Sequence, residues 1–583
     1  MNTKLIKKGI ASIRQYGFKV TYYRTVNRKK RQEQAELFMR DMIFTDNERV
    51  QQRNYRFGNA AKISILVPLY NTKAEFLKEL IESVMEQTYY NWELCLADAS
   101  DSGYEYISKL VTDYMRVDDR IFYKKLEKNG GISENTNACA RLATGDYIAL
   151  LDHDDLLAPN ALFEAALAIE KGADFIYTDE MTFEGEILNP ISIHFKPDFA
   201  PDNLRSNNYI CHLSVFSKEL FEKAGKFSSD CDGSQDYDII LRLTEQAENI
   251  VHIPKVLYYW RSHNASVASD IEAKPYCITS AIEAVDRHLE RIGIDGEAQR
   301  IPKAVSVYKI KYDVIGNPKV AVIIAANSTA AELDKCIASV IERAEYQNFE
   351  VIISENSKAS NKFEAVHKKY KNNDNIKIVK YSEKYDYALA CNCAAGQTDA
   401  EYLLFVDATC SVASYGFIKE MLMYAQRKDV GAVGGKIISH GKKILNAGYV
   451  LGLYGSAGNV FYGATDGDPG YMYKLYYAQN YSAVSSSLMM IKKEKFFSVS
   501  GFSNEYKNSY YDVDMCLNLL KNGYVNVFIP FASAVSGKNE SLQSPINRKD
   551  KQMFADKWKE EIALGDRYYN PNLSLESEDF SID

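Results

Sequence analysis

The chain contains two copies of one sequence pattern. Residues 147–155 read YIALLDHDD, and 255 positions later residues 402–410 read YLLFVDATC. Self-similarity at a fixed spacing indicates a repeated structural unit. A chain of 583 residues is also too long for a single hydrophobic core, so we expect two tandem domains. Further matching pairs are residues 81–100 with 337–357, and the segments that start at Gly225 and Gly501.

Within the first copy, short apolar runs alternate with segments that place apolar residues at helical spacing. Residues 62–67 and 92–97 predict buried strands, residues 122–124 predict a third strand, and residues 147–151 predict a fourth. Such alternation predicts an α/β fold with a doubly wound, mostly parallel sheet in each copy. Ligands of these sheets bind at the carboxyl ends of the strands. Because Asp98 and Asp152 follow predicted strands, we expect them to share one crevice.

The boundaries follow from changes in the pattern. A predicted helix stops at Gly293, and the turn at residues 316–318 precedes the first strand of the second copy. The last residues are acidic, and we expect them to fray. We therefore divide the chain into a basic N-terminal segment (1–58), a first domain (59–300), a linker (301–318), a second domain (319–570) and an acidic tail (571–583).

The N-terminal segment is basic and amphipathic. Residues 1–31 hold ten Lys or Arg and no Asp or Glu, whereas the whole chain has a net charge of −8. Such a segment can lie on an anionic membrane surface, or it can pack as a helix on the first domain; both alternatives stay open. No apolar run approaches the length of a spanning helix or of a signal peptide. We expect a cytoplasmic protein that does not bind nucleic acid and that could lie peripherally on the inner face of the plasma membrane.

Three carboxylates crowd into four positions at Asp152-His153-Asp154-Asp155, which we call the acidic cluster. Like charges repel unless a cation neutralises them, and oxygen ligands suit Mg²⁺ or Mn²⁺. The alternative is that one Asp caps the next helix, although this would explain only one of the three.

Two weaker signals follow later in the first copy. Asp236 and Asp238 lie near the start of a predicted helix, where a carboxylate often does no more than complement the helix dipole. Arg261 and His263 follow a strand-like run, where they could contact a phosphate and a metal respectively.

Together these pieces resemble a known family. The first copy is similar to family 2 inverting glycosyltransferases of the GT-A fold, and above all to bacterial enzymes of surface-polysaccharide and O-antigen assembly, often labelled rhamnosyltransferases. The second copy resembles the companion domain often fused behind them. The stretches that carry the resemblance span residues 60–270 and read ISILVPLYNT, NWELCLADASDS, NGGISENTNACARLATGDYIALLDHDDLLAPNAL, FIYTDE, FKPDFAPD, GSQDYDIILRL and HIPKVLYYWRSHNAS.

The resemblance implies a donor site for a UDP- or dTDP-sugar. Pro68, Tyr70 and Asp98 would line the nucleobase pocket, with Asp98 accepting a hydrogen bond from the base. The family commonly has two adjacent carboxylates at this place, and this chain has Ala97 and Asp98. In the family the second carboxylate of the pair contacts the nucleobase, and Asp98 holds that position. The role implied for Asp98 therefore stands although Ala97 replaces the first carboxylate.

The resemblance also implies the catalytic roles. Asp152 would lie beside the ribose and the metal, and Asp154 would bind Mn²⁺ or Mg²⁺ at the donor diphosphate. His263 would complete that site beside Arg261. Asp236 would act as the general base toward a hydroxyl of a glycan or lipid-linked acceptor. One base without a protein nucleophile implies a single displacement with inversion.

The second copy keeps the apolar frame but loses most of these groups. We therefore expect it to be catalytically degenerate, with a structural or glycan-binding role. The alternative for the second copy is a metal-independent active site, which would make the chain a bifunctional transferase. For the chain as a whole, the alternatives from other classes are a nucleotidyltransferase and a binding scaffold without catalysis. The correspondences are Asp98 with Glu355, Asp152 with Asp407, Asp154 with Thr409, Asp155 with Cys410, Arg261 with Gly537, and His263 with Asn539.

Overall fold

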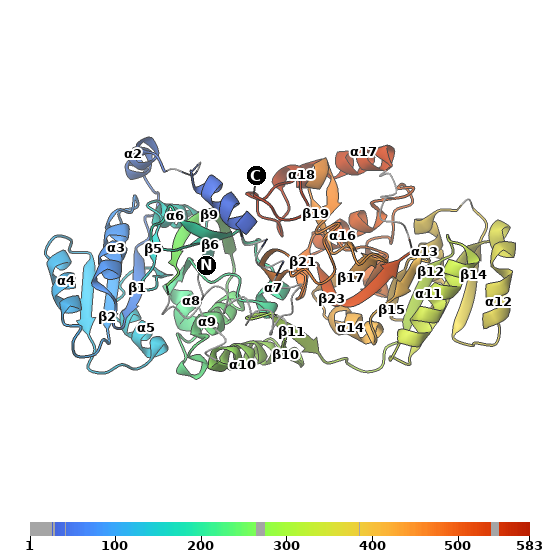
Figure 1. Cartoon of the computed structure of the whole chain (residues 1–583), viewed down its shortest axis with the longest axis horizontal. Helices are drawn as coiled ribbons and strands as arrows, with labels where there is room; N and C mark the ends of the chain where they lie inside the picture. The colour runs from blue at the N-terminus through green and yellow to red at the C-terminus, as the bar shows by residue number, and fades with distance from the viewer. Residues whose placement is uncertain are drawn as a thin grey trace.

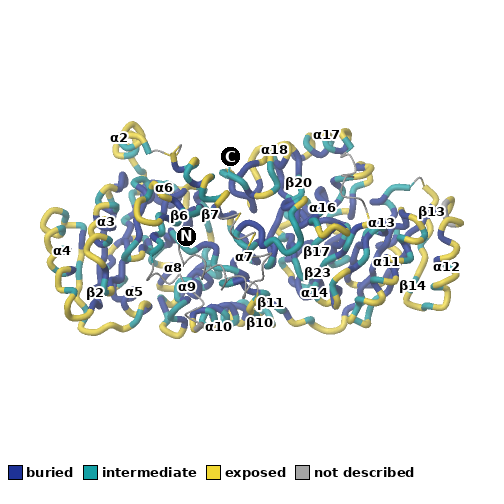
Figure 2. The backbone as a smooth tube through the Cα atoms, viewed as in Figure 1, coloured by how far each residue is buried: buried dark blue, intermediate teal, exposed yellow. Residues whose placement is uncertain are grey.

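The computed structural model describes residues 22, 26, 29–40, 42, 44–263, 275–302, 304–383, 385–537 and 547–582. Two large mixed sheets lie side by side along the long axis, each flanked by helices (Figure 1). Buried backbone follows the strands of both sheets, and exposed backbone follows the outer helices and loops (Figure 2). The expected α/β class with two tandem sheets is confirmed.

The first sheet has the strand order β3-β2-β1-β4-β8-β6-β9-β5, with β7 paired to β6. Its strands are β1 (Ile63–Leu69), β2 (Trp92–Asp98), β3 (Ile121–Lys125), β4 (Tyr147–Leu150), β5 (Leu156–Leu157), β6 (Phe175–Phe183), β7 (Pro190–His194), β8 (Ser214–Ser217) and β9 (Ile250–Arg261). Its helices are α2 (Asp46–Asn54), α3 (Ala74–Met85), α4 (Tyr106–Met115), α5 (Ile132–Ala140), α6 (Ala161–Glu170), α7 (Pro201–Ser206), α8 (Lys218–Lys223), α9 (Gln235–Thr244) and α10 (Pro275–Arg291).

The central strands are apolar on both faces because helices cover both faces. Every residue of β1 and β2 is buried, as in parallel sheets generally. Ile65 and Val67 of β1 pack in one cluster with Leu77 of α3, and Leu66 packs in another with Ala138 of α5. Such continuous apolar runs are what the sequence showed at these strands, and the parallel pairing of β1 with β2 and β4 fits the prediction.

The second sheet repeats the order of the first as β14-β13-β12-β15-β22-β17-β23-β16. Its strands are β12 (Val320–Ala325), β13 (Phe349–Asn356), β14 (Ile376–Tyr381), β15 (Tyr402–Val406), β16 (Cys410–Val412), β17 (Val430–Ser439), β18 (Ile444–Asn446), β21 (Gln479–Tyr481), β22 (Leu488–Lys492) and β23 (Val525–Ser536), beside the small ladder of β19 (Tyr449–Leu451) and β20 (Ala457–Asn459). Its helices are α11 (Ala330–Arg343), α12 (Glu364–Tyr370), α13 (Tyr387–Gly396), α14 (Phe417–Ala425), α15 (Lys493–Ser498), α16 (Tyr511–Lys521), α17 (Arg548–Lys557) and α18 (Lys559–Leu564).

The two copies also agree in strand register. Asp98 on β2 pairs with Lys125 on β3, and Glu355 on β13 pairs with Lys380 on β14. Both pairs are ion pairs, with N–O distances of 3.0 and 3.4 Å. Residues can therefore be compared between the copies by their distance from equivalent strand ends.

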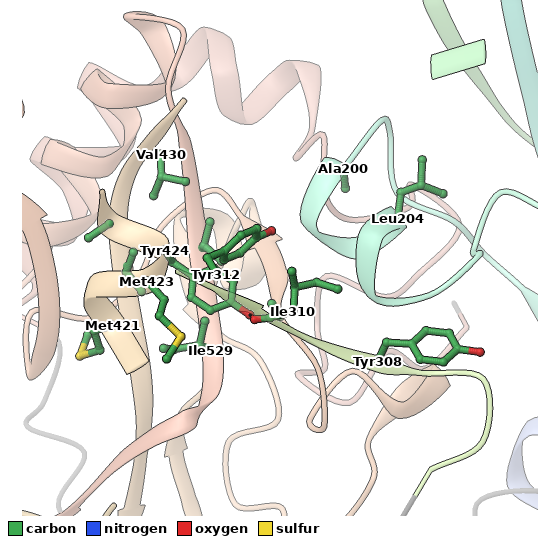
Figure 3. Close-up of a cluster of buried hydrophobic side chains, with 14 of the residues drawn as sticks. Ala200, Leu204, Tyr308, Ile310, Tyr312, Met421, Met423, Tyr424, Val430 and Ile529 are labelled. Atoms are coloured by element: carbon green, nitrogen blue, oxygen red, sulfur yellow. Dashed lines mark hydrogen bonds between the residues drawn. The ribbon is translucent and has the colours of Figure 1, made fainter. Parts of the chain in front are cut away.

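The stretch that we expected to be a linker is part of the core. It contains β11 (Tyr308–Tyr312), which pairs with β10 (Gly296–Arg300). Ile310 is 1% exposed, and it lies with Tyr424 of α14 on one side and Leu204 of α7 on the other (Figure 3). The alternation of apolar residues in β11 buries one face, so this segment joins the two copies by packing as well as by chain connection.

A buried polar network also crosses the junction. The Arg427 guanidinium pairs with the Asp202 carboxylate of α7, and both side chains are almost fully buried. Asn480 of β21 donates through Nδ2 to Asp202 Oδ2 at 2.9 Å, and its backbone N–H donates to Asn203 Oδ1 at 2.7 Å. Because buried polar groups need partners, this network fixes how α7 lies against the second copy.

The helix at residues 29–40 lies beside the acidic tail (Figure 1). Residues 29–40 are helical, and Arg31 donates to the Gly470 carbonyl at 3.2 Å while Lys30 pairs with Asp579 at 2.6 Å. The acidic tail is not frayed, because Phe580 is 4% exposed and stacks on Tyr471. Most of the basic segment, residues 1–21, lies outside the described residues. Along the described part of the chain, none of the helices is both long and apolar enough to cross a bilayer.

Candidate active site

The predicted nucleobase group lies at the carboxyl ends of β1 and β2. Asp98 is 1% exposed; its Oδ1 accepts from the Ser100 N–H at 2.8 Å, and its Oδ2 accepts from Tyr123 Oη at 2.7 Å and Lys125 Nζ at 3.0 Å. Burial alone would raise the pKa of Asp98, but these hydrogen bonds outweigh burial and lower it. Asp98 is therefore held as a carboxylate with a fixed orientation.

Pro68 and Tyr70 complete this group. Pro68 is buried within β1, where it pairs in register with Ala97. Tyr70 follows β1 and is 41% exposed, with its hydroxyl 3.1 Å from Asp101 Oδ2. An exposed ring beside an ordered carboxylate offers a planar base both a stacking surface and a hydrogen-bond acceptor.

The three carboxylates of the acidic cluster have different environments. Asp155 is fully buried and accepts from Tyr258 Oη and the Arg261 N–H, both at 2.7 Å. Burial, followed by the charges of Asp154 and Asp152, raises the pKa of Asp155 well above its usual value. The side chain of Asp152 is 53% exposed, and that of Asp154 is 17% exposed. Asp155 thus anchors the loop to β9, whereas Asp152 and Asp154 remain available to a ligand.

The alternative that an Asp caps the next helix does not apply. Helix α6 has Asn160 at its N-cap, with no side-chain hydrogen bond to the helix. Instead the acidic cluster follows β4, and Asp154 Oδ2 lies 2.7 Å from His263 Nε2 at the end of β9. Two strands that are distant in the sequence therefore bring the predicted metal ligands Asp154 and His263 together.

Arg261 stabilises the position of Asp154 beside His263. Its side chain is 5% exposed; Nε donates to the Asp154 carbonyl at 2.7 Å, and Nη2 pairs with Glu79 Oε2 at 2.5 Å. The guanidinium also lies over the Phe76 ring, 4.6 Å from its centroid. These contacts occupy the guanidinium, so Arg261 holds the backbone of Asp154 in place.

A histidine that the sequence analysis missed lies beside Asp152. His212 Nε2 is 4.0 Å from Asp152 Oδ2, and its ring stacks on Tyr258 at a centroid distance of 4.5 Å. Asp152, Asp155 and His212 each offer one ligand atom within 4.8 Å of the others. No signal in the sequence pointed to His212, because it precedes β8 in an apolar stretch about 60 positions beyond the acidic cluster.

A buried ion pair holds His212 in this position. Lys196 Nζ lies 3.0 Å from Glu180 Oε2 and donates to the carbonyls of Ile210 and His212, while the His212 N–H donates to the same Glu180 carboxylate. Burial would raise the pKa of Glu180, but the Lys196 ammonium outweighs burial and lowers it to about 2. The turn before β8 is therefore fixed by charge-assisted hydrogen bonds.

Asp236 and Asp238 play different parts although both lie in the first turn of α9. Asp238 is 2% exposed and pairs with Arg242 one turn later, with Nη2 and Oδ2 2.5 Å apart. Asp236 accepts from Asn208 Nδ2 at 3.0 Å. Burial raises the pKa of Asp236, and the nearby His212 opposes that shift only in part. A carboxyl with a raised pKa can take up a proton more readily than an ordinary aspartate.

Comparison with known proteins gives two relatives that match about nine tenths of the chain. It is 35% identical to protein y4gI of Sinorhizobium fredii over 90% of its length, and 28% identical to the O-antigen biosynthesis protein RfbC of Myxococcus xanthus over 91%. It spans 59% and 42% of those two relatives. The structure of S. aureus TarS 1–349 in complex with UDP overlaps 39% of this chain and 72% of that one, at 19% identity and a TM-score of 0.30, which is too slight to add to the argument.

The sequence model of the family "Glycosyl transferase family 2" matches residues 64–225 and again residues 320–496. These segments hold the equivalent strands of the two sheets, and together they make up more than half of the chain. The match confirms the resemblance that the motifs indicated for both copies. The chain belongs to glycosyl transferase family 2.

Proposed function

We propose that the first copy is a metal-dependent, inverting glycosyltransferase that moves a sugar from a nucleoside diphosphate donor to a hydroxyl of a glycan or lipid-linked acceptor. The name of the O-antigen relative supports bacterial surface-polysaccharide synthesis as its setting. The observation that carries the proposal is the convergence of Asp154 with His263 at 2.7 Å, at the same sheet edge as Asp152. UDP or dTDP is the nucleotide of the donor.

The side chains of the proposed metal ligands Asp152, Asp154 and His263 suit a divalent cation, although among the described residues the three whose ligand atoms lie within 4.8 Å of one another are Asp152, Asp155 and His212. Carboxylate oxygens and an imidazole suit Mn²⁺, and carboxylates suit Mg²⁺. Asp154 and His263 approach each other from two elements, Asp152 is exposed, and the Arg261 contacts keep the Asp154 backbone in place. When bound there, the cation neutralises negative charge that develops on the leaving diphosphate.

Asp236 is the proposed general base. A sugar hydroxyl is a weak nucleophile, so a carboxylate must accept its proton as the bond to the anomeric carbon forms. The raised pKa of Asp236 suits proton uptake, and the hydrogen bond from Asn208 orients its Oδ2. With one base and no protein nucleophile, the leaving diphosphate departs from the opposite face, and the anomeric configuration inverts.

The remaining donor contacts follow from the strand ends. Asp98 accepts a hydrogen bond from the base through Oδ1, which also accepts from the Ser100 N–H, and Tyr70 stacks on the base beside Pro68. For Arg261 we had expected direct contact with the diphosphate. Its contacts with Glu79 and the Asp154 carbonyl favour a positioning role, with the phosphate contact secondary.

We also propose that the second copy transfers no sugar, because its surviving carboxylates are used within the fold. Asp407 Oδ1 accepts from both the N–H and the hydroxyl of Thr409, at 2.8 and 2.6 Å. Asp512, the counterpart of Asp236, accepts from the N–H and hydroxyl of Ser486 at 3.0 and 3.2 Å. Asp514 accepts from Trp558 Nε1 at 2.8 Å.

The test is a transfer assay with a panel of UDP- and dTDP-sugars and Mn²⁺. Asp154→Ala should abolish transfer and the Mn²⁺-dependent part of nucleotide binding. Asp236→Asn should keep nucleotide binding but lower transfer by about 10²-fold or more. The matched control is Asp113→Ala, which removes an exposed carboxylate on α4 that pairs with Arg116 at the surface. Full activity in excess chelator would refute the metal dependence.

A further inference from the structure

One turn of the first copy reaches both the donor side and the acceptor side of the proposed site. His212 Nε2 in this turn is 4.0 Å from Asp152 Oδ2, on the donor side. The Cys211 N–H donates to Asn208 Oδ1 at 3.4 Å, and Asn208 Nδ2 donates to Asp236 Oδ2 at 3.0 Å, on the acceptor side. We call the segment from Asn208 to His212 the His212 turn. A shift of this turn would change the contacts of both carboxylates.

The His212 turn is held in an unfavourable backbone conformation. Cys211 has a φ of 41°, in the left-handed region that residues with a Cβ rarely adopt. Residues in this region persist where the surrounding contacts impose the conformation, and they cluster at functional sites. The contacts here come from Lys196, whose fully buried ammonium donates to the carbonyls of Ile210 and His212. The position of Lys196 therefore decides whether the turn keeps its conformation.

Lys196 is itself held by a residue from the C-terminal end of the chain. Asn570 Nδ2 donates to the Lys196 carbonyl at 2.9 Å and to Asp179 Oδ2 at 2.8 Å, and the Lys196 N–H donates to Asp179 Oδ1 at 2.9 Å. All three residues are buried. Asn570 thus closes a ring of three hydrogen bonds around the backbone of Lys196. A buried network of this kind fixes its members only while every polar group in it has a partner.

The segment that carries Asn570 is docked on the first copy by further contacts. The Asp198 N–H donates to the Arg567 carbonyl at 2.8 Å, and Asn572 Nδ2 donates to the Pro254 carbonyl at 2.8 Å. The Asn572 N–H also donates to Asn570 Oδ1 at 2.9 Å, which orients the Asn570 amide. We call the segment from Arg567 to Asn572 the C-terminal clasp. Although the clasp follows the second copy in the chain, these contacts bind it to the first.

The second copy has different residues where the first supports the His212 turn. Equivalent strand pairs of the two sheets place a Ser, a Lys and an Ile at these positions. An Ile offers no carboxylate to a buried ammonium. Because both sheets nevertheless have the same strand order, the fold does not require these groups, and they occur in the copy that has the metal-ligating side chains. The correspondences are His212 with Ser487, Asp179 with Lys436, and Glu180 with Ile437.

We propose that Asn570 is a positioning residue for the active site of the first copy, and that the C-terminal clasp completes this site. Asn570 fixes the backbone of Lys196, the Lys196 ammonium fixes the His212 turn, and the turn keeps its contacts with Asp152 and Asp236. The inference rests on the proposed function, because that function assigns the two carboxylates to sugar transfer. It adds that the first copy depends on residues that follow the second copy in the chain.

The first test is a double-mutant cycle in the sugar-transfer assay with the full chain and Mn²⁺. Asn570→Ala should lower kcat by about 10-fold, because a small displacement of positioned groups slows transfer. The KM for the nucleotide sugar should stay within about 2-fold, since the nucleobase group lies elsewhere, at the ends of β1 and β2. In a His212→Ala background the same change should have little further effect on kcat, because Asn570 acts through the turn.

The matched control is Asn572→Ala. It removes the side-chain contact with Pro254, while the Asn572 backbone N–H still orients the Asn570 amide. We expect kcat within about 2-fold of wild type for this variant. An equal loss of kcat on Asn570→Ala in the wild-type and His212→Ala backgrounds would overturn the proposal, because Asn570 would then act independently of the turn.

The second test follows the His212 turn without any transfer. Cys211 and Cys393 are partly exposed, and the other eight cysteines of the chain are buried. Asn570→Ala should speed the alkylation of Cys211 by iodoacetamide several-fold and leave that of Cys393, in α13, unchanged, as peptide mass spectrometry would show. Unchanged labelling of Cys211, or equal acceleration at both cysteines, would overturn the proposal. Faster labelling of Cys211 alone in a protein that transfers no sugar would refute the proposed function and support the positioning of the turn by Asn570.

Discussion

Replacing Arg427 by methionine should destabilise the junction between the two copies. The side chains of Arg427 and Asp202 are 3% and 1% exposed, and the guanidinium also donates to Tyr312 Oη at 3.0 Å and pairs with Asp429 at 2.6 Å. The Asp202 carboxylate raises the pKa of Arg427 well above its usual value even though burial alone would lower it, so the pair is ionised. Methionine fills the space but leaves the buried Asp202 carboxylate with the more distant Arg205 Nη1, 3.8 Å away, as its cation.

The magnitude follows from what remains around Asp202. Removing one partner of a buried ion pair typically costs about 3–5 kcal/mol. Because Asn480 still donates to Asp202 Oδ2 at 2.9 Å, we expect the lower end, about 3 kcal/mol. For a domain of this size that corresponds to a fall in Tm of about 6–12 °C.

Differential scanning calorimetry and urea unfolding measure this loss. Arg427→Met in an Asp202→Asn background should cost much less, since no carboxylate is stranded. Arg343→Met, which removes an exposed arginine beside Glu342, should change stability by less than about 0.5 kcal/mol. A loss below about 1 kcal/mol for Arg427→Met, or an equal loss in the Asp202→Asn background, would refute the reasoning.

Three further predictions address the second copy and the chain ends. Asp512→Asn should leave transfer near the wild-type rate; loss of one of two distinct linkages in the product would show a second active site. Burial lowers the pKa of Lys474 to about 7, so the folded protein disfavours the charged form of this side chain. The free energy of unfolding should therefore rise between pH 7 and pH 10, where the unfolded chain still binds the proton and the folded protein does not. Lys474→Met should flatten that rise in urea unfolding. Deleting residues 1–28 should release the protein from anionic vesicles in a flotation assay while Lys30 and Arg31 keep their contacts; equal retention would favour the packed-helix alternative.

Much of the fold could be predicted from the sequence because its signals are local. Apolar runs such as residues 62–67 and 92–97 are buried on both faces, and their composition alone indicates parallel strands. The duplication is a property of the sequence itself, and the two sheets with the same strand order are its consequence. For the linker and the tail, the structure shows packing that the sequence did not predict. In both, a few apolar side chains, such as Ile310 and Phe580, find partners that are distant in the sequence.

In the candidate site, the acidic cluster likewise has properties that the sequence predicts and properties that only the tertiary structure decides. That three carboxylates in four positions favour a cation could be inferred from charge alone, and the resemblance implied that Asp154 and His263 meet. Only the tertiary structure decided that Asp155 is an internal anchor, and that His212 joins the site through the Glu180–Lys196 pair. Spacing along the chain determines which groups can be neighbours on one element. The burial of each group depends on the elements that pack over that group from elsewhere in the chain. Burial in turn decides the pKa of the group and its access to a ligand.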